Sequence, residues 1–509
     1  MFMIDLHRDA TTPLYKQVHV ELARRIRAGE LRPGSRLPSV RNLAQQLGVS
    51  LITIVQAYDA LASEGLVRAA VGRGTFVGSP PPAAPAGDGR PGDAPVPPTG
   101  TEWQATLPVY LRAPRIAALQ ALLRPALRGD VISLAGGTPD PTLFPLRALG
   151  RLWRRVMAIE DPRFLQYGAP QGDTSLRTWV AGHCGSLGIS AGPDDVLITS
   201  GSQQAIDLIA RTFVGPGDYV VVESPTFPTA LDLFEGRGAK LLGVPVDAEG
   251  MRVDVADALA ERYRPRLVYT IPTAHNPTGV TMSEDRRRRL SDLARRHNVL
   301  VLEDDTCSEF AYDGDAPPAV MAFDTGGHVT FIKSFSKTVI PGLRVGCVVA
   351  RGTILDRLIE SKSIVDRFTS PLIQRTLWRY LSARQYLRDL ETARATYQRR
   401  RDVVLRALEE FMPPGVTWTH PAAGFNLWLN LPEGVSAAEA FEEGLKEGIA
   451  CGFGDLFLPH TPPPSGLRIS FADKPESTIS EGIRRLSGAI GRLISREPRK
   501  TPREFVTSV

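Results

Sequence analysis

The chain has 509 residues, of which 43% are hydrophobic and 23% are charged, and its formal net charge is +5. This length predicts two or three folding units, and the composition is that of an ordinary globular protein. No apolar run reaches the length of a bilayer span and no signal peptide is visible, so we expect a cytoplasmic protein with no membrane segment.

Residues 1–78 show the apolar spacing of three helices followed by a hairpin. A four-residue apolar repeat predicts the first helix. Ser39 and Ser50 stand at the N-cap positions of a second and a third helix, and Gly48 ends the second. The hairpin follows, with Arg73 in its Gly-Arg-Gly tip. Helix, glycine turn and helix form a helix-turn-helix, which the hairpin extends into a compact winged helix.

Residues 14–78 resemble the GntR-type winged helix-turn-helix, through elements such as Leu-Arg-Pro-Gly-Ser-Arg-Leu-Pro-Ser at 31–39 and Gly-Arg-Gly-Thr-Phe-Val at 72–77. The resemblance implies binding to double-stranded DNA. Arg41 would contact the DNA backbone, Thr53 would face the major groove beside Ser50, and Arg73 would reach the minor groove. Residues 1–78 contain ten basic and six acidic side chains, a net +4 of the chain's +5. This surplus suits a module that meets phosphates.

The first turn of the third helix departs from the GntR pattern, which is usually polar there and often has an arginine after the position of Ser50. This chain has Leu51 and Ile52, with Val55 one turn further on. Apolar side chains can touch thymine methyl groups but cannot hydrogen-bond guanine. Either the operator is read through A/T methyl groups and shape, or the affinity for DNA is weakened.

Residues 79–102 are rich in Pro, Ala and Gly, and this composition predicts a linker because it cannot bury a core. We expect residues 103–495 to form the second domain and residues 496–509 to form a C-terminal tail. The chain's cysteines, Cys184, Cys307, Cys347 and Cys451, have no metal-binding spacing. We expect them to be reduced thiols, with no metal site.

Four predicted strands of the second domain are each followed by a motif that suits a flat, phosphorylated cofactor. Gly201 turns into a helix N-terminus, which is an anion site made of backbone N–H groups. Phe227 could stack on a heterocycle, and the Asp304 carboxylate could pair with a pyridinium nitrogen. The motifs are Gly201-Ser202-Gln203 after strand 196–199, Glu223–Phe227 after 219–222, Asn276-Pro277-Thr278-Gly279 after 267–270, and Asp304 after 299–303.

A fifth motif, Ser334-Phe335-Ser336-Lys337, is followed by Arg344 seven residues after the lysine. The lysine amine can form a Schiff base with an aldehyde. The serine hydroxyls and the planar arginine fork can hold a phosphate dianion. The motif therefore suits an aldehyde cofactor that carries a phosphate.

Together these segments resemble the fold-type I, aspartate-aminotransferase superfamily over roughly residues 112–495. The resemblance implies an α/β fold and pyridoxal 5'-phosphate as cofactor. Lys337 would form the internal aldimine, and Arg468 would grip the α-carboxylate of an amino acid. Asp304 would hold the ring nitrogen, on the opposite strand face from Glu303 and Asp305. The other cofactor contacts implied are Ser202, Gln203, Phe227, Asn276, Ser334, Ser336, Arg344 and, across a homodimer, Tyr167.

Two positions depart from the superfamily pattern. Phe227 stands where a tyrosine is usual, so a plain core role is its alternative. The tyrosine that usually follows the aspartate and bonds the cofactor's ring oxygen is replaced here by Thr306 or Cys307. We expect Thr306 to line the cofactor site, and we expect its lack of a phenol to slow transamination more than it weakens cofactor binding.

A winged helix, a linker and a fold-type I domain in one chain resemble the MocR family of transcriptional regulators. The resemblance implies a homodimeric regulator in which an amino acid or other small amine reacts with the Lys337 aldimine and alters DNA affinity. The alternative is an active aminotransferase, converting an amino acid to a 2-oxo acid, with a vestigial or autoregulatory DNA-binding domain. The enzyme-like motif at Asn276 favours this alternative.

Overall fold

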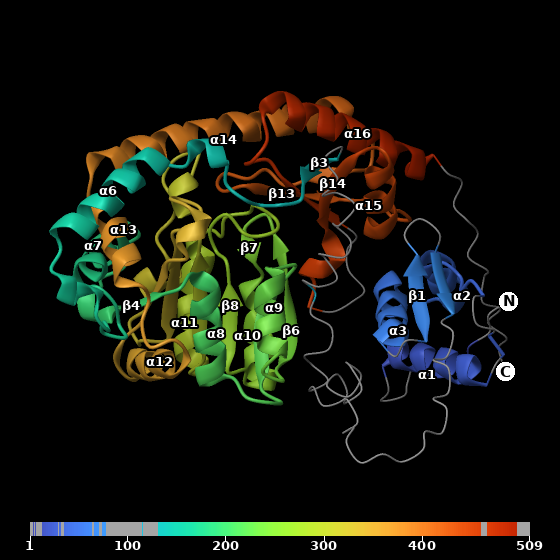
Figure 1. The fold of residues 1–509 in the computed structure, drawn as a ribbon, viewed down its shortest axis with the longest axis horizontal. Helices are drawn as coiled ribbons and strands as arrows, with labels where there is room; N and C mark the ends of the chain where they lie inside the picture. Colours follow the sequence, from blue (N-terminus) through green and yellow to red (C-terminus); the bar gives the residue numbers. More distant parts are fainter. Residues whose placement is uncertain are drawn as a thin grey trace, which may run out of the picture. The chain divides into compact units, whose positions relative to one another are not determined.

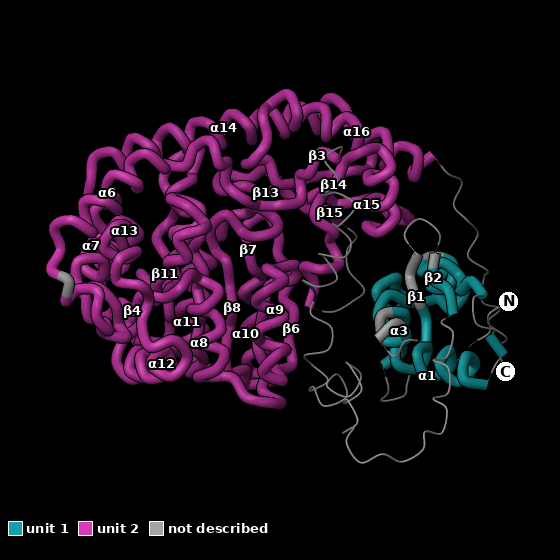
Figure 2. The backbone as a smooth tube through the Cα atoms, in the orientation of Figure 1, with its two compact units in different colours: residues 1–118 teal, residues 119–509 magenta. Residues whose placement is uncertain are grey.

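The computed structural model describes residues 13–28, 35–63, 66–70, 74–77, 131–459 and 466–495, together with residues 4, 6, 30, 31 and 115. The chain divides into two compact units, residues 1–118 and 119–509 (Figure 2). The predicted linker 79–102, the tail 496–509 and the boundary at residue 103 lie outside the described residues, and they stay predictions.

The first unit is a winged helix-turn-helix, as the sequence predicts. Its elements are α1 (Leu14–Arg27), α2 (Val40–Leu47), α3 (Leu51–Ser63), β1 (Val67–Ala70) and β2 (Gly74–Val77) (Figure 1). The Ser39 hydroxyl caps α2 by accepting a hydrogen bond from the Asn42 amide at 3.2 Å. Gly48 ends α2 with φ 61°, a left-handed conformation that glycine adopts without steric cost. The two strands pair antiparallel and form the wing.

Apolar side chains from all three helices form the core of this unit. Val18 and Leu22 of α1 meet Leu43 of α2 and Ile54 and Leu61 of α3, and all five are buried. The Tyr58 hydroxyl donates a 2.7 Å hydrogen bond to the Pro38 carbonyl, which ties α3 to the start of α2. These contacts fix which side of α3 faces the core and which side is left outward.

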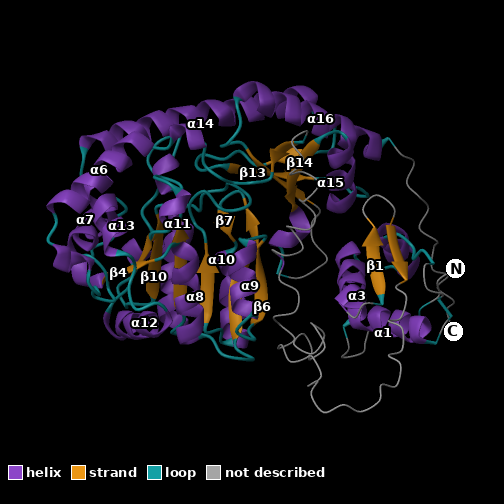
Figure 3. Cartoon of the chain, viewed as in Figure 1, coloured by secondary structure: helices purple, strands orange, loops and turns teal. Residues whose placement is uncertain are grey.

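The second unit is built on an eight-stranded sheet in the described part of the chain, with strand order β4-β11-β10-β9-β8-β5-β6-β7 (Figure 3). Strands β10, β9, β8, β5 and β6 run parallel, whereas β11 and β7 run antiparallel to their neighbours. The central strands are almost continuously apolar and buried, as expected for a sheet covered on both faces. The bounds are β4 (Val196–Thr199), β5 (Tyr219–Ser224), β6 (Lys240–Asp247), β7 (Gly250–Met251), β8 (Leu267–Thr270), β9 (Leu300–Asp305), β10 (Val329–Ser334) and β11 (Gly346–Val349).

Helices connect and cover these strands, and a smaller mixed sheet with order β12-β13-β15-β14-β3 follows (Figure 1). The long helix α14 runs from the large sheet toward α16 beside the small sheet. The helices are α6 (Leu146–Ile159), α7 (Thr174–Gly185), α8 (Ser202–Phe213), α9 (Pro228–Glu235), α10 (Val253–Tyr263), α11 (Glu284–His297), α12 (Gly352–Val365), α13 (Pro371–Leu381), α14 (Arg384–Phe411), α15 (Ala437–Lys446) and α16 (Glu476–Ile494). The small-sheet strands are β3 (Ile132–Leu134), β12 (Thr417–Trp418), β13 (Asn426–Asn430), β14 (Ile449–Phe453) and β15 (Gly466–Ser470).

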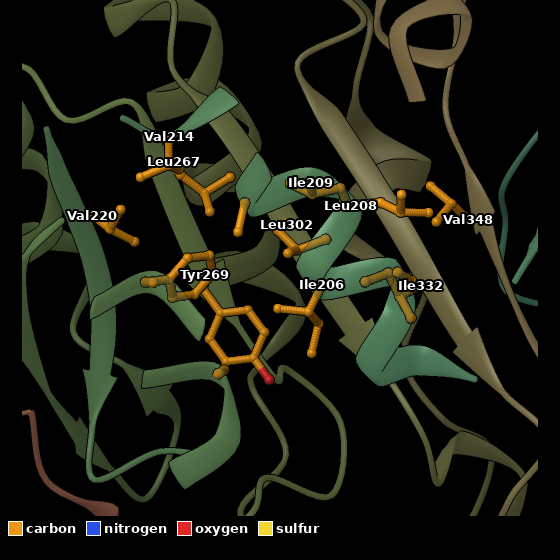
Figure 4. Packing of buried hydrophobic residues seen from close by; sticks show 14 of the residues in the cluster. Ile206, Leu208, Ile209, Val214, Val220, Leu267, Tyr269, Leu302, Ile332 and Val348 are labelled. Carbon is orange, nitrogen blue, oxygen red and sulfur yellow. The ribbon is translucent and has the colours of Figure 1, made fainter. Parts of the chain in front are cut away.

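The core of the large unit lies between α8 and the central strands. Ile206 and Ile209 of α8 pack with Leu302 of β9 and Ile332 of β10 in one buried cluster (Figure 4). This packing holds the first turn of α8 against the carboxyl ends of the strands, where ligands bind in open α/β sheets. In the part of the chain that the structure describes, no helix is both long enough and apolar enough to cross a membrane.

Candidate functional site

A tight turn between β4 and α8 forms one end of the candidate site. Gly201 has φ 96°, and a Cβ built on it would lie 2.6 Å from Arg344 Nη2. Gly346 is equally constrained, since its Cβ would lie 2.9 Å from the Ser202 amide nitrogen. Ser334 pairs with Gly346 in the β10–β11 register. The absence of side chains at the two glycines therefore lets the guanidinium of Arg344, the N-terminus of α8 and Ser334 approach one another.

The other predicted phosphate ligands lie on the same two segments. Ser202 and Gln203 begin α8, whose first amides have no side-chain cap from the residues that the structure describes. The Ser336 amide donates a 3.3 Å hydrogen bond to the Ser334 hydroxyl. The structure thus brings together the predicted set Ser202, Gln203, Ser334, Ser336 and Arg344 around one turn, which can hold an anion by charge and by backbone N–H groups.

A hydrogen-bonded support behind this turn was missed by the sequence reasoning. The Ser200 amide donates to Gln204 Oε1 at 2.7 Å, and Gln204 Nε2 donates to Asp366 Oδ2 at 2.7 Å. Lys362, which is fully buried, donates to Asp366 Oδ1 at 2.7 Å. These hydrogen bonds hold the turn between β4 and α8 in place. Local sequence gives no signal for them, because the Gln204–Asp366 pair is 162 residues apart.

Asp304 lies within β9 rather than after its end, because the strand continues to Asp305; the predicted strand end was wrong. The Tyr269 hydroxyl of β8 donates a 2.8 Å hydrogen bond to Asp304 Oδ2, while Oδ1 has no partner among the described residues. Burial raises the pKa of Asp304 to about 7, although the bond from Tyr269 acts in the opposite direction. Asp305 points to the other face and accepts a 2.8 Å hydrogen bond from Lys333, as strand alternation predicts.

Lys337 lies partly buried in the loop after β10, and its Nζ donates a 2.6 Å hydrogen bond to the Gly137 carbonyl. Burial lowers the pKa of the Lys337 ammonium, and the nearby Arg468 charge lowers it further. A lower pKa leaves more of the lysine as the neutral amine that can attack an aldehyde. The segment after β3 that supplies Gly137 was also missed, and its only sequence signal is the Gly136-Gly137 pair.

Arg468 of β15 joins two further loops to this region. Its Nη1 donates to Asn276 Oδ1 at 2.9 Å, and its Nη2 donates to the Ala135 carbonyl. The guanidinium also lies 4.8 Å from the centre of the Phe457 ring. Burial lowers the pKa of Arg468 to about 10, and its Nε has no partner among the described residues. The guanidinium therefore stays charged at neutral pH, and its predicted contact with a carboxylate stays a prediction.

The two residues at the usual tyrosine position differ in their surroundings. The Cys307 thiol is buried, and burial raises its pKa to about 11 while the charge of Lys337 acts to lower it. The Thr306 hydroxyl lies 3.7 Å from Cys307 Sγ. Neither residue supplies a phenol to the site.

The two aromatic residues of the prediction lie in different settings. Phe227 is the residue before α9, partly buried, and it packs against the core cluster of the large unit. Tyr167 is 80% exposed, with its ring 5.8 Å from that of Phe368 and the Arg367 guanidinium 5.3 Å from its centre. The predicted stacking role of Phe227 and the cross-dimer role of Tyr167 stay predictions.

The predicted DNA-contact residues belong to the first unit. Ser50 Oγ accepts a 3.1 Å hydrogen bond from the Thr53 amide and lies 2.8 Å from Thr53 Oγ1, so the two hydroxyls form a cap at the start of α3. Arg41 is on α2, but its side chain lies outside the described residues, as does the whole of Arg73. Their DNA contacts stay predictions.

Comparison with known families divides the chain as its structure does. Residues 130–486 match the family described as aminotransferase class I and II. Residues 14–77 match the gntR family of bacterial regulatory proteins.

Solved structures and curated proteins resemble either the large unit or the whole chain. A kynurenine aminotransferase from Pyrococcus horikoshii, solved with PMP, superposes with a TM-score of 0.73 at 36% identity, covering 77% of this chain and 98% of that one. Aromatic-amino-acid aminotransferase 1 of Thermococcus litoralis is 37% identical over 74% of this chain and 92% of its own length. The probable rhizopine catabolism regulatory protein MocR of Rhizobium meliloti is 29% identical over 96% of both chains. The uncharacterized HTH-type transcriptional regulator YjiR of Escherichia coli is 30% identical over 94% of this chain and 99% of its own length.

Proposed function

Since the chain belongs to the aminotransferase class I and II family over residues 130–486 and to the gntR family over residues 14–77, we propose that it is a DNA-binding transcriptional regulator that senses an amino compound through pyridoxal 5'-phosphate. The observation that carries this proposal is that full-length relatives named as regulators are similar to both units of this chain. MocR and YjiR are similar to this chain over 94% of its length or more, whereas aminotransferases match only its large unit.

The residues present fit the cofactor. The glycine turn brings the first amides of α8 close to the Arg344 guanidinium, which a Cβ on Gly201 would meet, and these groups would hold the phosphate. Asp304 Oδ1, which has no partner among the residues that the structure describes, would accept a hydrogen bond from a protonated ring nitrogen. The lowered pKa of Lys337 keeps its amine available. Bound pyridoxal phosphate supplies an aldehyde that links covalently to primary amines and a ring that withdraws electrons.

The effector is proposed to carry both a primary amine and a carboxylate. Arg468 presents a charged planar fork, and charge-assisted hydrogen bonds to a carboxylate would replace or extend its contact with Asn276. The amine would take the place of Lys337 on the cofactor. DNA affinity changes only if this exchange favours one conformation of the protein over another. We further propose that the protein acts as a cytoplasmic homodimer, with Tyr167 contributing to the partner's phosphate site.

The test uses the full chain loaded with pyridoxal phosphate and a panel of amino acids. The cofactor's absorption, 2-oxo acid formation and affinity for a promoter fragment are measured on the same samples. The proposal expects at least one carboxylate-bearing amine to change both the absorption and the DNA affinity. Borohydride reduction followed by peptide mapping should place the cofactor on Lys337. An adduct on another lysine, or none, would contradict the assignment of the cofactor site.

A working aminotransferase is the second candidate. It is favoured by one observation, the bond between Arg468 and Asn276 beside Lys337, which assembles an enzyme-like set of side chains. The missing phenol at Thr306 and Cys307 opposes it, because the cofactor loses a ring-oxygen donor. Fast multiple-turnover formation of 2-oxo acid, with no effect of the amine on DNA affinity, would make this candidate the better account.

A further inference from the structure

The outward side of α3 carries apolar side chains that the core does not use. Ile52 and Val55 are partly exposed and lie outside the core cluster of described residues, whereas Leu51 packs against that cluster. Ile52 and Val55 are three residues apart, and Gln56 follows four residues after Ile52, so these positions share one side of the helix. That side is turned away from the buried residues Ile54 and Ala57.

The polar groups of the first turn are already engaged. Ser50 Oγ accepts the Thr53 amide at 3.1 Å and lies 2.8 Å from Thr53 Oγ1. Turning the Ser50 hydroxyl away from the helix and toward a base would therefore break its bond with the Thr53 amide. A hydroxyl held in an N-cap stabilises the helix by about 1 kcal/mol, which opposes such a displacement. The first turn thus offers one hydroxyl hydrogen that the Ser50–Thr53 bond does not use, together with the methyl groups of Ile52.

We propose that α3 selects DNA sites through the C5-methyl groups of thymines, with Ile52 and Val55 as the contacting side chains. The inference rests on the proposed DNA binding and specifies what that site reads. In the major groove only thymine presents a methyl group, and the N-terminal residues of a recognition helix contact base edges there. Gln56 can bond adenine N6 and N7, the partner base of the same pair.

Duplex DNA is the occupant that the observations favour for this surface. Residues 1–78 have a net charge of +4, which suits a phosphate backbone on either side of the groove. An apolar face on a helix that follows a glycine turn in a gntR-family unit is placed to enter that groove. A site without thymine methyl groups would leave Ile52 and Val55 against polar base edges.

The experiment uses the full chain loaded with pyridoxal phosphate. Sequences that bind are selected from a random duplex pool. Each is then copied with either thymidine or deoxyuridine, which differ only by the C5-methyl group of the base. The proposal expects the deoxyuridine copy to bind more weakly by about fourfold per contacted methyl, the value of one buried methyl-sized group. Unselected random duplexes should bind equally well in both forms.

Protein variants assign the methyl effect to α3. Ile52→Ala and Val55→Ala should each reduce the ratio between the thymine and deoxyuridine affinities. Val20→Ala is the matched control, because Val20 is an exposed aliphatic residue of α1, and it should keep the wild-type ratio. Equal wild-type affinity for both copies would overturn the inference, as would a ratio unchanged in the two α3 variants. Failure to bind any duplex would instead overturn the proposed function.

Discussion

The Tyr269 hydroxyl donates a 2.8 Å hydrogen bond to Asp304 Oδ2, joining the neighbouring parallel strands β8 and β9 inside the sheet. Tyr269 is fully buried among the apolar side chains of the core (Figure 4). The bond orients the carboxylate that we propose to pair with the ring nitrogen of the cofactor. The other carboxylate oxygen has no partner in the described part of the chain. Tyr269 is therefore a positioning residue that no sequence motif indicated.

Tyr269→Phe should destabilise the cofactor-free protein more at pH 8.5 than at pH 5.5. The pKa of Asp304 is raised to about 7, so the carboxyl is charged at the higher pH and protonated at the lower one. A hydrogen bond to a charged group contributes about 1.5–3 kcal/mol, against about 1 kcal/mol for a neutral one. Denaturant unfolding at both pH values measures the difference. Tyr312→Phe is the matched control, because the Tyr312 hydroxyl bonds the neutral Gly424 carbonyl, and its loss should not depend on pH.

Asp304→Asn should change the pH dependence of stability in a defined direction. The folded-state pKa of Asp304 is raised from 3.8 to about 7, so between these values the folded protein binds more protons than the unfolded one. The contribution of Asp304 to the free energy of unfolding therefore falls as pH rises from about 4 to 7. The asparagine variant lacks this contribution. Between about pH 4 and 7, the free energy of unfolding of the cofactor-free variant should therefore fall less than that of the wild type. Identical slopes would show that Asp304 titrates normally.

Gly201→Ala should weaken cofactor binding by at least about tenfold. The alanine Cβ would lie 2.6 Å from Arg344 Nη2, and φ 96° is strained for any residue with a side chain. Gly217→Ala separates the backbone strain from the clash with Arg344, since Gly217 has a similar φ of 88° but no atom of the described residues within 4 Å of the added Cβ. Titration of the cofactor-free protein with pyridoxal phosphate measures both variants. A similar loss of affinity in the two would mean that the turn at Gly201 has no special role.

Arg468→Ala should lower the affinity of the protein for the responding amine by at least about tenfold. Charge-assisted hydrogen bonds of this kind contribute about 1.5–3 kcal/mol each. Cofactor binding should be retained, since the phosphate turn and Asp304 are untouched. Arg468→Lys is the informative partner variant, because it keeps the charge but loses the planar fork, and it should show an intermediate affinity. Absorption titrations with the amine measure all three proteins. Unchanged affinity in Arg468→Ala would move the carboxylate site elsewhere.

Arg41→Ala and Arg73→Ala should each weaken binding to selected and random DNA alike. If each arginine contacts one phosphate, the slope of log affinity against log salt should fall by roughly 0.9 per variant. Arg73→Ala should in addition relax a preference for A/T sequences if the side chain enters the minor groove. Fluorescence anisotropy at several salt concentrations provides the slopes. Wild-type binding that does not depend on salt would contradict phosphate contacts altogether.

The sequence by itself determined the local features of both units. Ser39, Gly48 and Ser50 mark helix ends because a cap depends on residues only three or four positions away. The buried strands and the glycine turn before α8 were equally predictable, because their apolar runs and turn residues are contiguous. The family resemblance then placed Lys337, Asp304 and Arg468 in one site.

Only the tertiary structure decided which distant groups complete that site. Lys337 bonds a carbonyl 200 residues away, and Arg468 bonds Asn276 across 192 residues. Neither Tyr269 nor the Asp366 support carries a motif, because their partners are distant in the sequence. Tyr269 meets Asp304 through the pairing of β8 with β9, and Asp366 at the end of α12 meets Gln204 of α8. The same holds for α3, where the sequence left open whether Leu51 and Ile52 redirect DNA reading or weaken DNA affinity. Packing separates them, since Leu51 lies against the core while Ile52 lies outside that cluster of described residues.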